Sequence, residues 1–291
     1  MSNCMLRGFA FVLGVSVLMG SGGSTVYADW VPGEGMAASM AINILLGKEI
    51  EENSDLGFCD TCYMGAYIQP GQDSWFQMPL EAGVQYVFAG AVDKKCDLDI
   101  LIEDGSGQRL AVDAGSDNIP VVRFTPPATL VYKVRLKLFS GPGSRFCGIV
   151  LLKEGGWTLP VGNLGAAAGQ MLQRCERVSS VVPARFLEVP GEWAVIGSVC
   201  RNGGTAGWRD MKFGSGRRVV VTGADSHSRD TDLRLTRDNG SGSEVDEDDE
   251  SDNEPVLEFR SRSSDRYSLH IENARSSGAT IIMTALLEVE N

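Results

Sequence analysis

The sequence predicts a mainly all-β protein made of two tandem, jelly-roll-like antiparallel β-sandwiches, each with an N-terminal helix. Three observations support this fold class. Short segments that alternate apolar and polar residues recur with Gly, Pro, Asn and Asp between them, as in stacked antiparallel sheets. The pattern repeats itself after about 130 residues. Each copy opens with apolar residues at helical spacing.

The repeat is clearest in residues 96–107 and 230–240. Both segments read Asp-x-Asp, then alternating apolar residues, then an acidic turn with Gly. At an offset of 133 residues Trp75 also falls on Trp208, and at 135 residues 116–120 fall on 251–255. Matches in a fixed order with one small shift indicate a duplicated unit in which the second copy has gained two residues.

The two copies predict similar elements in the same order. Apolar residues at helical spacing predict helices over 36–45 and 167–178. The strands predicted for the first copy are 66–68, 74–78, 85–91, 98–103, 121–124, 130–138 and 147–153. Those predicted for the second copy are 195–200, 209–213, 218–223, 232–236, 256–260, 267–272 and 280–289. We expect a first unit over 29–155 and a second over 156–291, joined by a glycine-rich linker.

Residues 1–28 have the organisation of a secretory signal peptide. Arg7 precedes an apolar run, and Val26-Tyr27-Ala28 offers a cleavage site before Asp29. A retained membrane anchor is the alternative, but the apolar run is shorter than the ~20 residues that a bilayer span needs. We therefore expect an exported protein, periplasmic or extracellular, with no transmembrane segment after the signal is removed.

The charge of the predicted mature chain limits its partners. Loss of Arg7 leaves 25 basic and 38 acidic residues, a net charge of −13. This balance disfavours nucleic acid and anionic membranes, which attract cationic surfaces. It is compatible with bound cations or with basic partners.

The repeated pattern resembles the bacterial pre-peptidase C-terminal domain. The resemblance is carried by 83–88, 97–107 and 132–136 in the first copy, and by matching segments in the second, about 90 residues of each copy. It implies a jelly-roll-like β-sandwich of a kind found on exported enzymes. The helix in front of each copy is a departure from that family.

Paired aspartates in each copy are candidate calcium ligands. Strand alternation places Asp97 and Asp99 on one face, and oxygen-rich sites of this kind suit Ca²⁺, which takes six to eight oxygen ligands. The alternative is that these carboxylates shape turns by accepting backbone N–H groups. The full candidate set is Asp97, Asp99, Asp113 and Asp117 in the first copy and Asp230, Asp232, Asp248 and Asp252 in the second. The neighbouring run 244–254 has eight acids in eleven residues and predicts a solvated, disordered loop.

Six cysteines remain after the signal, which in an oxidising compartment predicts three disulfides. The Cys-x-x-Cys spacing of Cys59 and Cys62 is also that of redox and zinc motifs. A redox motif would lie at a helix start after a strand, whereas this one lies between a helix and the first strands. A zinc site would need a second ligand pair, for which only Cys96 and Cys147 are available in that unit. Structural disulfides are therefore favoured, although the sequence leaves the connectivity open. The pairs considered are Cys59–Cys62, Cys96–Cys147 and Cys175–Cys200.

No catalytic constellation emerges. His227 and His270 are the two histidines, and the Ser-His-Ser-Arg-Asp segment around His227 does not predict a triad, because neighbours in an extended segment point apart. Trp75 and Trp208 match between the copies and are candidate ligand contacts, with core packing as the alternative.

We therefore expect an exported, non-catalytic binding or envelope-associated protein that recognises a protein or glycan, with calcium as its one candidate cofactor. The alternative is a secreted hydrolase with a carboxylate site on Asp97 and Asp99, or on Asp230 and Asp232. A purely structural or assembly role is a third hypothesis.

Overall fold

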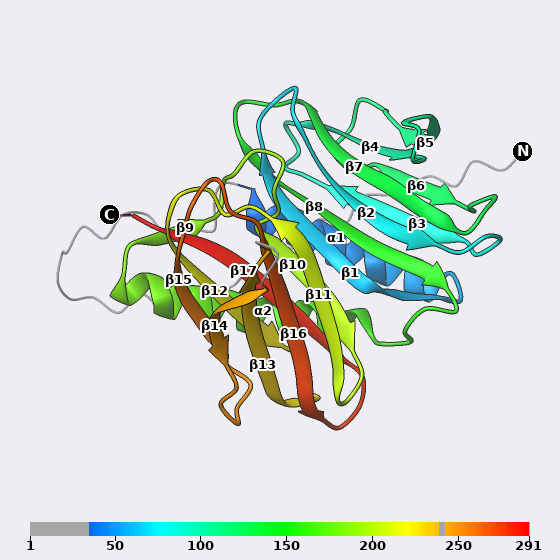
Figure 1. Ribbon diagram of the computed structural model, residues 1–291. Helices are drawn as coiled ribbons and strands as arrows, with labels where there is room; N and C mark the ends of the chain where they lie inside the picture. Colours follow the sequence, from blue (N-terminus) through cyan, green and yellow to red (C-terminus); the bar gives the residue numbers. More distant parts are fainter. Residues whose placement is uncertain (1–34, 239–241, 291) are drawn as a thin grey trace, which may run out of the picture.

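The computed structural model describes residues 35–238 and 242–290, so the predicted signal peptide lies outside the described residues. The described chain is mainly β, with strands arranged in antiparallel sheets and two helices (Figure 1). This confirms the predicted fold class.

The elements follow the predicted order in both copies. The first copy contains α1 (Met36–Glu52), β1 (Leu56–Ile68), β2 (Asp73–Leu80), β3 (Tyr86–Ala91), β4 (Asp97–Glu103), β5 (Arg109–Asp113), β6 (Val121–Phe124), β7 (Leu130–Ser140) and β8 (Arg145–Glu154). The second contains α2 (Val161–Val181), β9 (Ala184–Phe186), β10 (Val195–Cys200), β11 (Gly204–Met211), β12 (Gly216–Ala224), β13 (Ser228–Arg237), β14 (Ser243–Asp248), β15 (Val256–Ser261), β16 (Tyr267–Ser276) and β17 (Thr280–Val289).

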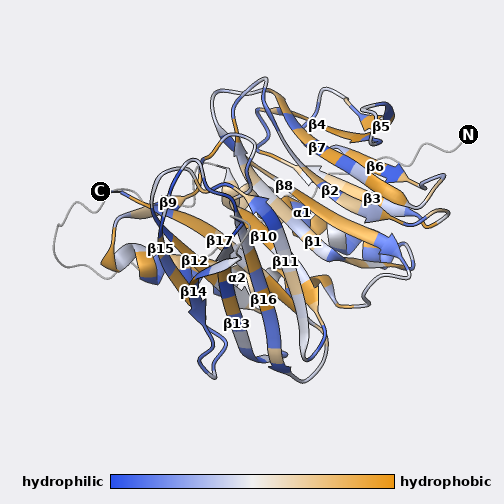
Figure 2. Ribbon diagram, viewed as in Figure 1, coloured by the Kyte–Doolittle hydropathy of each residue, from blue (hydrophilic) through white to orange (hydrophobic). Residues whose placement is uncertain are grey.

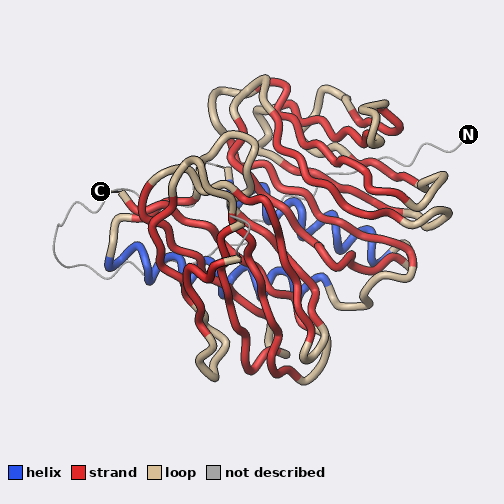
Figure 3. Tube along the Cα trace, in the orientation of Figure 1, coloured by secondary structure: helices blue, strands red, loops and turns tan. Residues whose placement is uncertain are grey.

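Three sheets and two helices form the layers. One nine-stranded sheet runs through both copies in the order β15-β12-β17-β10-β1-β8-β3-β6, with β9 on β17. The two helices pack on this sheet, α1 against β8, β3 and β1 and α2 against β12 and β17 (Figure 3). The four-stranded sheets β2-β7-β4-β5 and β11-β16-β13-β14 complete the two sandwiches. Apolar residues follow β8 and β17, whereas β14 and β16 carry many hydrophilic ones (Figure 2).

The copies are joined by antiparallel pairing of β1 with β10, and the joint has an internal two-fold relation. Met64 pairs with Ile196, and Ile196 is also the residue that corresponds to Met64 in the second copy, 132 positions later. The flanking pairs, Tyr63 with Gly197 and Gly65 with Val195, exchange under the same offset. Over these three pairs this is the geometry of a symmetric dimer interface within one chain, and the register shift between Thr61 and Tyr63 ends the symmetry. The division of the chain at residue 155 stays a prediction.

Three strands were not predicted, and several others, β1 above all, begin earlier than expected. The run 244–254 is not wholly a solvated loop, since β14 pairs with β13 and Arg234 forms an ion pair with Glu247, with Nε 3.1 Å from a carboxylate oxygen. β5 and β9 are short and lack a strong apolar pattern. β1 begins ten residues earlier than expected, because it is buried on both faces and its sequence does not alternate.

Candidate functional site

A cleft of about 480 Å³ lies at the junction between the two copies. Its walls come from β1, the linker, β10 and β11, so both copies contribute to it. The residues that line it are Asp60, Thr61, Trp157, Ser198, Val199, Cys200, Arg201 and the segment 203–208.

Trp157 is the linker residue of this cleft, and the backbone fixes its position. The Phe58 N–H donates to the Trp157 carbonyl oxygen at 2.9 Å, and the Trp157 N–H donates to the Phe58 carbonyl oxygen at 2.8 Å. The indole Nε1 donates to Asp60 Oδ1 at 2.7 Å. The linker is thereby tied to β1, and a half-buried aromatic ring is held at the cleft wall.

Strand β11 supplies the opposite wall. A turn in which the Gly204 N–H donates to the Arg201 carbonyl oxygen at 2.8 Å leads from β10 into β11, with Gly203 at a φ of 66°. Such a positive φ favours glycine. Among the described strands β11 pairs with β16 alone and is therefore an edge strand, which leaves one row of its backbone polar groups unpaired by the sheet.

Some polar groups of the cleft can still form hydrogen bonds. Ser198 is 1% exposed, and its hydroxyl oxygen has no hydrogen-bond partner among the described residues. Arg201 and Thr205 are exposed. A cleft lined by two aromatic side chains and a few polar groups has the usual composition of a ligand site.

The matched tryptophans do not occupy equivalent places. Trp75 is 43% exposed, with Lys133 Nζ 4.0 Å from the centre of its ring, so the core alternative is wrong for Trp75. Trp208 is half-buried and lines the cleft. The strand pairings explain the difference. In the first copy Trp75 pairs with Arg135. In the second copy His270 corresponds to Arg135, but His270 pairs with Gly207 and not with Trp208. A shift of one residue turns a side chain to the other face of a sheet.

Four of the candidate calcium ligands hold the backbone of a loop in the same way in both copies. Asp113 accepts the Gly115 N–H at 3.2 Å and the Val121 N–H at 2.9 Å. Its counterpart Asp248 accepts N–H groups at the matching positions, from Glu250 at 3.3 Å and Val256 at 2.9 Å.

The second aspartate of each loop also accepts the same hydrogen bonds in both copies. The Asp117 carboxylate accepts the Ile119 N–H at 2.8 Å, and the Asp252 carboxylate accepts the Glu254 N–H at 2.7 Å. The backbone carbonyl of each also accepts one N–H from the Asp-x-Asp strand, at 2.9 and 2.8 Å. These four carboxylates thus have the turn-shaping role that was the alternative to calcium.

The carboxylates of the two Asp-x-Asp strands have fewer hydrogen-bond partners. Asp97 Oδ1 and Asp230 Oδ1 are buried without a hydrogen-bond partner among the described residues. Burial, reinforced by Asp97, raises the pKa of Asp99. Burial, reinforced by Asp230 and Glu272, raises the pKa of Asp232 to about 6. Asp232, Glu272 and Asp249 also line a smaller hollow of about 210 Å³ on the second four-stranded sheet.

These carboxylates do not form a ready metal site. Within 35–238 and 242–290 no three His, Cys, Asp or Glu side chains are grouped so that they could hold a metal ion. Calcium binding by the eight aspartates stays a prediction.

The six described cysteines are buried free thiols, so none of the three predicted disulfides is present in the structure. Cys59 and Cys62 were expected between the first helix and the first strands but lie inside β1, in the stretch between Phe58 and Tyr63 where the strand register shifts. Cys62 interacts electrostatically with Cys59 and with Cys200 on β10, although Cys200 was expected to pair with Cys175. Burial raises the pKa of Cys59 and of Cys200 to about 12, which suppresses the thiolate that oxidation requires.

The histidines lie outside the cleft. In the described part of the chain, the His227 ring contacts Asn163 at 3.3 Å and Asp225 at 3.3 Å, and no serine hydroxyl is among its partners. Burial, with Arg234 and Arg209 nearby, lowers the pKa of His270. Neither histidine completes a nucleophile–base pair.

The described helices include none that is both long and apolar enough to cross a membrane.

A scan of protein-family models and a search of curated proteins found no match to the sequence. Solved structures with similar arrangements include the major capsid protein P2 of bacteriophage PM2, at 10% identity and a TM-score of 0.21, covering 79% of this chain and 97% of that one. They also include the tandem CBM51 modules of Sp3GH98, the family 98 glycoside hydrolase from Streptococcus pneumoniae SP3-BS71, at 11% identity and a TM-score of 0.24, covering 78% and 83%. The CBM22-1-CBM22-2 tandem domain of Paenibacillus barcinonensis Xyn10C matches at 7% identity and a TM-score of 0.23, covering 74% and 82%. At TM-scores this low the likeness carries no argument about function.

Proposed function

We propose that this is an exported, non-catalytic binding protein that recognises a protein or glycan ligand in the cleft between its two copies. The observation that carries the proposal is the cleft itself, whose lining includes Trp157, Trp208 and Ser198, a serine whose buried hydroxyl has no hydrogen-bond partner among the described residues. Aromatic faces and unsatisfied polar groups are what a ligand can cover with a gain in free energy. In this proposal the copies are sandwich modules of pre-peptidase C-terminal type.

An array of glycans and extracellular-matrix proteins tests this function with the mature chain. We expect a ligand whose binding is lost in Trp208→Ala, because that change removes one wall of the cleft. Trp75→Ala is the matched control, because Trp75 is the residue of the first copy that aligns with Trp208 but lies on an exposed face. Folded protein that binds nothing on the array, or binding that both variants retain, would contradict the proposal.

Calcium assistance is a second part of the proposal and has its own test. A calorimetric Ca²⁺ titration of the mature protein is compared with variants in which Asp97 and Asp99, or Asp230 and Asp232, are replaced by Asn. Saturable heat that is lost in these variants supports a site in the Asp-x-Asp strands. The absence of heat in the wild type removes calcium from the proposal.

The alternative of a carboxylate hydrolase is favoured by one observation, the hollow beside Asp232. A carboxyl group with a pKa of about 6 is in the range of a general acid. Hydrolysis of a glycan on the array that is lost in Asp232→Asn, with folding unchanged, would replace the binding proposal with this one.

A further inference from the structure

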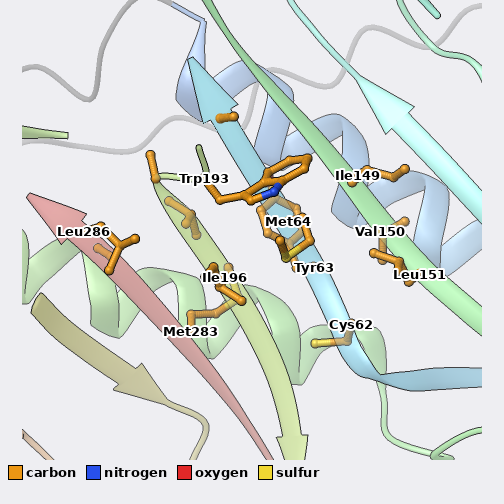
Figure 4. Close-up of a cluster of buried hydrophobic side chains, with 14 of the residues drawn as sticks. Cys62, Tyr63, Met64, Ile149, Val150, Leu151, Trp193, Ile196, Met283 and Leu286 are labelled. Atoms are coloured by element: carbon orange, nitrogen blue, oxygen red, sulfur yellow. The ribbon is translucent and has the colours of Figure 1, made fainter. Parts of the chain in front are cut away.

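The nine-stranded sheet opens where the two copies join. The pairing of β1 with β10 ends at Thr61 and Ser198. β10 continues to Cys200, and over this last part β17 is its strand partner among the described strands. Figure 4 shows β1 bending away from β10 at Cys62. Beyond Ser198, one edge of β10 therefore has no described strand beside it.

The linker covers the corresponding edge of β1. Phe58 pairs with Leu152 of β8 on one edge, and on the other it exchanges two backbone hydrogen bonds with Trp157, at 2.9 and 2.8 Å. The edge of β1 is thereby closed by the chain itself. The edge of β10 is not, and residues 198–201 line the cleft.

A second open edge faces the same cleft from β11. Its residues 204–208 pair with β16 on one edge, and the described part of the chain places no strand on the other. All of residues 203–208 line the cleft. Side chains of consecutive residues in a strand point to alternate faces, so a cleft that touches every residue meets the main chain. Gly203, Gly204 and Gly207 have no side chains that could cover it.

We propose that an extended segment of a partner protein binds in this cleft as an added strand on β11. This inference rests on the proposed function and chooses a protein ligand over a glycan. The main chain of the segment pairs with the open edge of β11, and the end of β10 lies across the cleft from it. An extended peptide presents alternating N–H and carbonyl groups at the spacing of a strand edge, which a glycan lacks. The added strand continues the β-pairing that joins the two copies.

The Ser198 side chain also favours a polar ligand at this place. Ser198 is 1% exposed, and its hydroxyl has no hydrogen-bond partner among the described residues. A buried polar group without a partner costs free energy, and a hydrogen bond with the segment would recover it. Since Ser198 lies at the point where the β1–β10 pairing ends, the hydroxyl and the two open edges belong to one cleft.

The test uses the mature protein and the probe peptide acetyl-Gly-Thr-Val-Thr-Val-Gly-amide, whose β-branched residues favour an extended main chain. We expect saturable changes in the backbone amide resonances of residues 204–208 and in the indole N–H resonances of Trp157 and Trp208. Two matched peptides carry N-methyl groups, one on both Thr nitrogens and one on both Val nitrogens, so each lacks the donors of one edge. At least one of them should bind about tenfold more weakly, as loss of main-chain hydrogen bonds predicts. The absence of saturable changes would overturn the inference, as would equal binding of the three peptides.

Two proline variants locate the pairing on β11. Thr205 and Ala206 are adjacent in the strand, so their N–H groups point to opposite edges, one towards β16 and one towards the cleft. Proline removes the N–H at either position. We expect one of Thr205→Pro and Ala206→Pro to lower the melting temperature, and the other to fold and to bind the probe about tenfold more weakly.

A third variant serves if neither proline variant folds. Ser198→Ala removes the buried hydroxyl, and it should keep or raise the melting temperature and weaken the probe severalfold. Unchanged probe binding in every folded variant would contradict the inference. A glycan on the array that binds through Trp208, with no binding of the probe, would overturn this inference and leave the proposed function standing.

Discussion

At the scale of single residues, Gly223 sets how closely α2 approaches the central sheet. A Cβ atom at this position would run into the backbone of Met171 and the carbonyl oxygen of Ala167 on α2. Helix backbone cannot move aside as a side chain can. The absence of a side chain at residue 223 is therefore a packing requirement.

We expect Gly223→Ala to lower the free energy of unfolding by about 2 kcal/mol, the usual range for overpacking a core. Gly169→Ala is the control, because Gly169 lies exposed on the same helix with open space around its Cβ position. That change should raise the free energy of unfolding by about 0.5–1 kcal/mol through helix propensity. Urea denaturation of both variants measures this, and a Gly223→Ala protein as stable as the wild type would contradict the packing argument.

Asp232 gives a pH dependence of definite sign. Burial raises the pKa of Asp232 to about 6, so the folded chain holds this proton more tightly than the unfolded chain does. The stability that this provides is complete below the unfolded pKa and is lost as the pH rises through about 6. Above that pH the ionised carboxylate opposes folding.

Asp232→Asn should therefore raise the melting temperature at neutral pH, and the gain should shrink as the pH falls towards the unfolded pKa of aspartate. Asp104 is the control of opposite sign. Its hydrogen bond from the Ser106 hydroxyl, joined by backbone N–H groups, lowers the pKa of Asp104. Asp104→Asn should lower the melting temperature at neutral pH and have no such effect in acid. Calorimetric scans across the pH range measure both melting temperatures. A difference between Asp232→Asn and the wild type that does not change with pH would contradict the raised pKa of Asp232.

At the scale of elements, each helix is anchored to the sheet by buried polar side chains that donate to strand carbonyl groups. On α1, Ser39 Oγ donates to the Ala91 carbonyl oxygen at 2.7 Å, and Asn43 Nδ2 donates to that of Ala89 at 3.0 Å. On α2, Arg174 is 3% exposed and donates to the carbonyl oxygen of Thr222 at 2.6 Å. Arg174 also donates to the Asn253 carbonyl oxygen at 2.5 Å, which ties the acidic loop to the helix.

Replacing Arg174 with Met should remove the donor to the buried Thr222 carbonyl group and to the part-buried Asn253 carbonyl group, and lower the free energy of unfolding by about 2–4 kcal/mol. Arg177→Met removes an exposed arginine three residues away on the same helix, whose partner is Glu254. An exposed pair of this kind is worth about 0–1 kcal/mol. Chemical denaturation of the two variants provides the comparison, and equal losses would show that Arg174 is not an anchor.

At the scale of the whole molecule, the two copies share one sheet and one hydrophobic core. The core runs without interruption from residues of β8 in the first copy to residues of β17 in the second. The β1–β10 pairing at its centre buries Met64, Ile196 and Trp193. Separation of the copies would expose this apolar surface and two strand edges.

We therefore expect the mature protein to unfold in a single transition, with equal calorimetric and van't Hoff enthalpies. Fragments 29–155 and 156–291 should be unstable apart and recover native spectra when mixed, because each supplies the edge that the other lacks. Two resolved transitions, or two fragments that each fold as stable monomers, would contradict this expectation. The same experiment tests the predicted division of the chain at residue 155.

The sequence by itself determined the fold class, the duplication and most of the strands. These follow from local alternation of apolar residues and from matches such as the Asp-x-Asp strands, which need no knowledge of distant contacts. The edge strand β14 was not predicted, because its acidic sequence gives no local apolar signal and its pairing with β13 is what makes it a strand.

Only the tertiary structure decided how the copies join and where a ligand could enter. The pairing of β1 with β10 brings Asp60, Trp157, Ser198 and Trp208 to one cleft from four separate segments. Sequence comparison also matched Trp75 to Trp208, whereas a one-residue shift in strand pairing turns them to different surroundings. A shift of one residue leaves the sequence pattern almost unchanged but reverses the face of every side chain it affects, and that is why the structure was needed to place the candidate site.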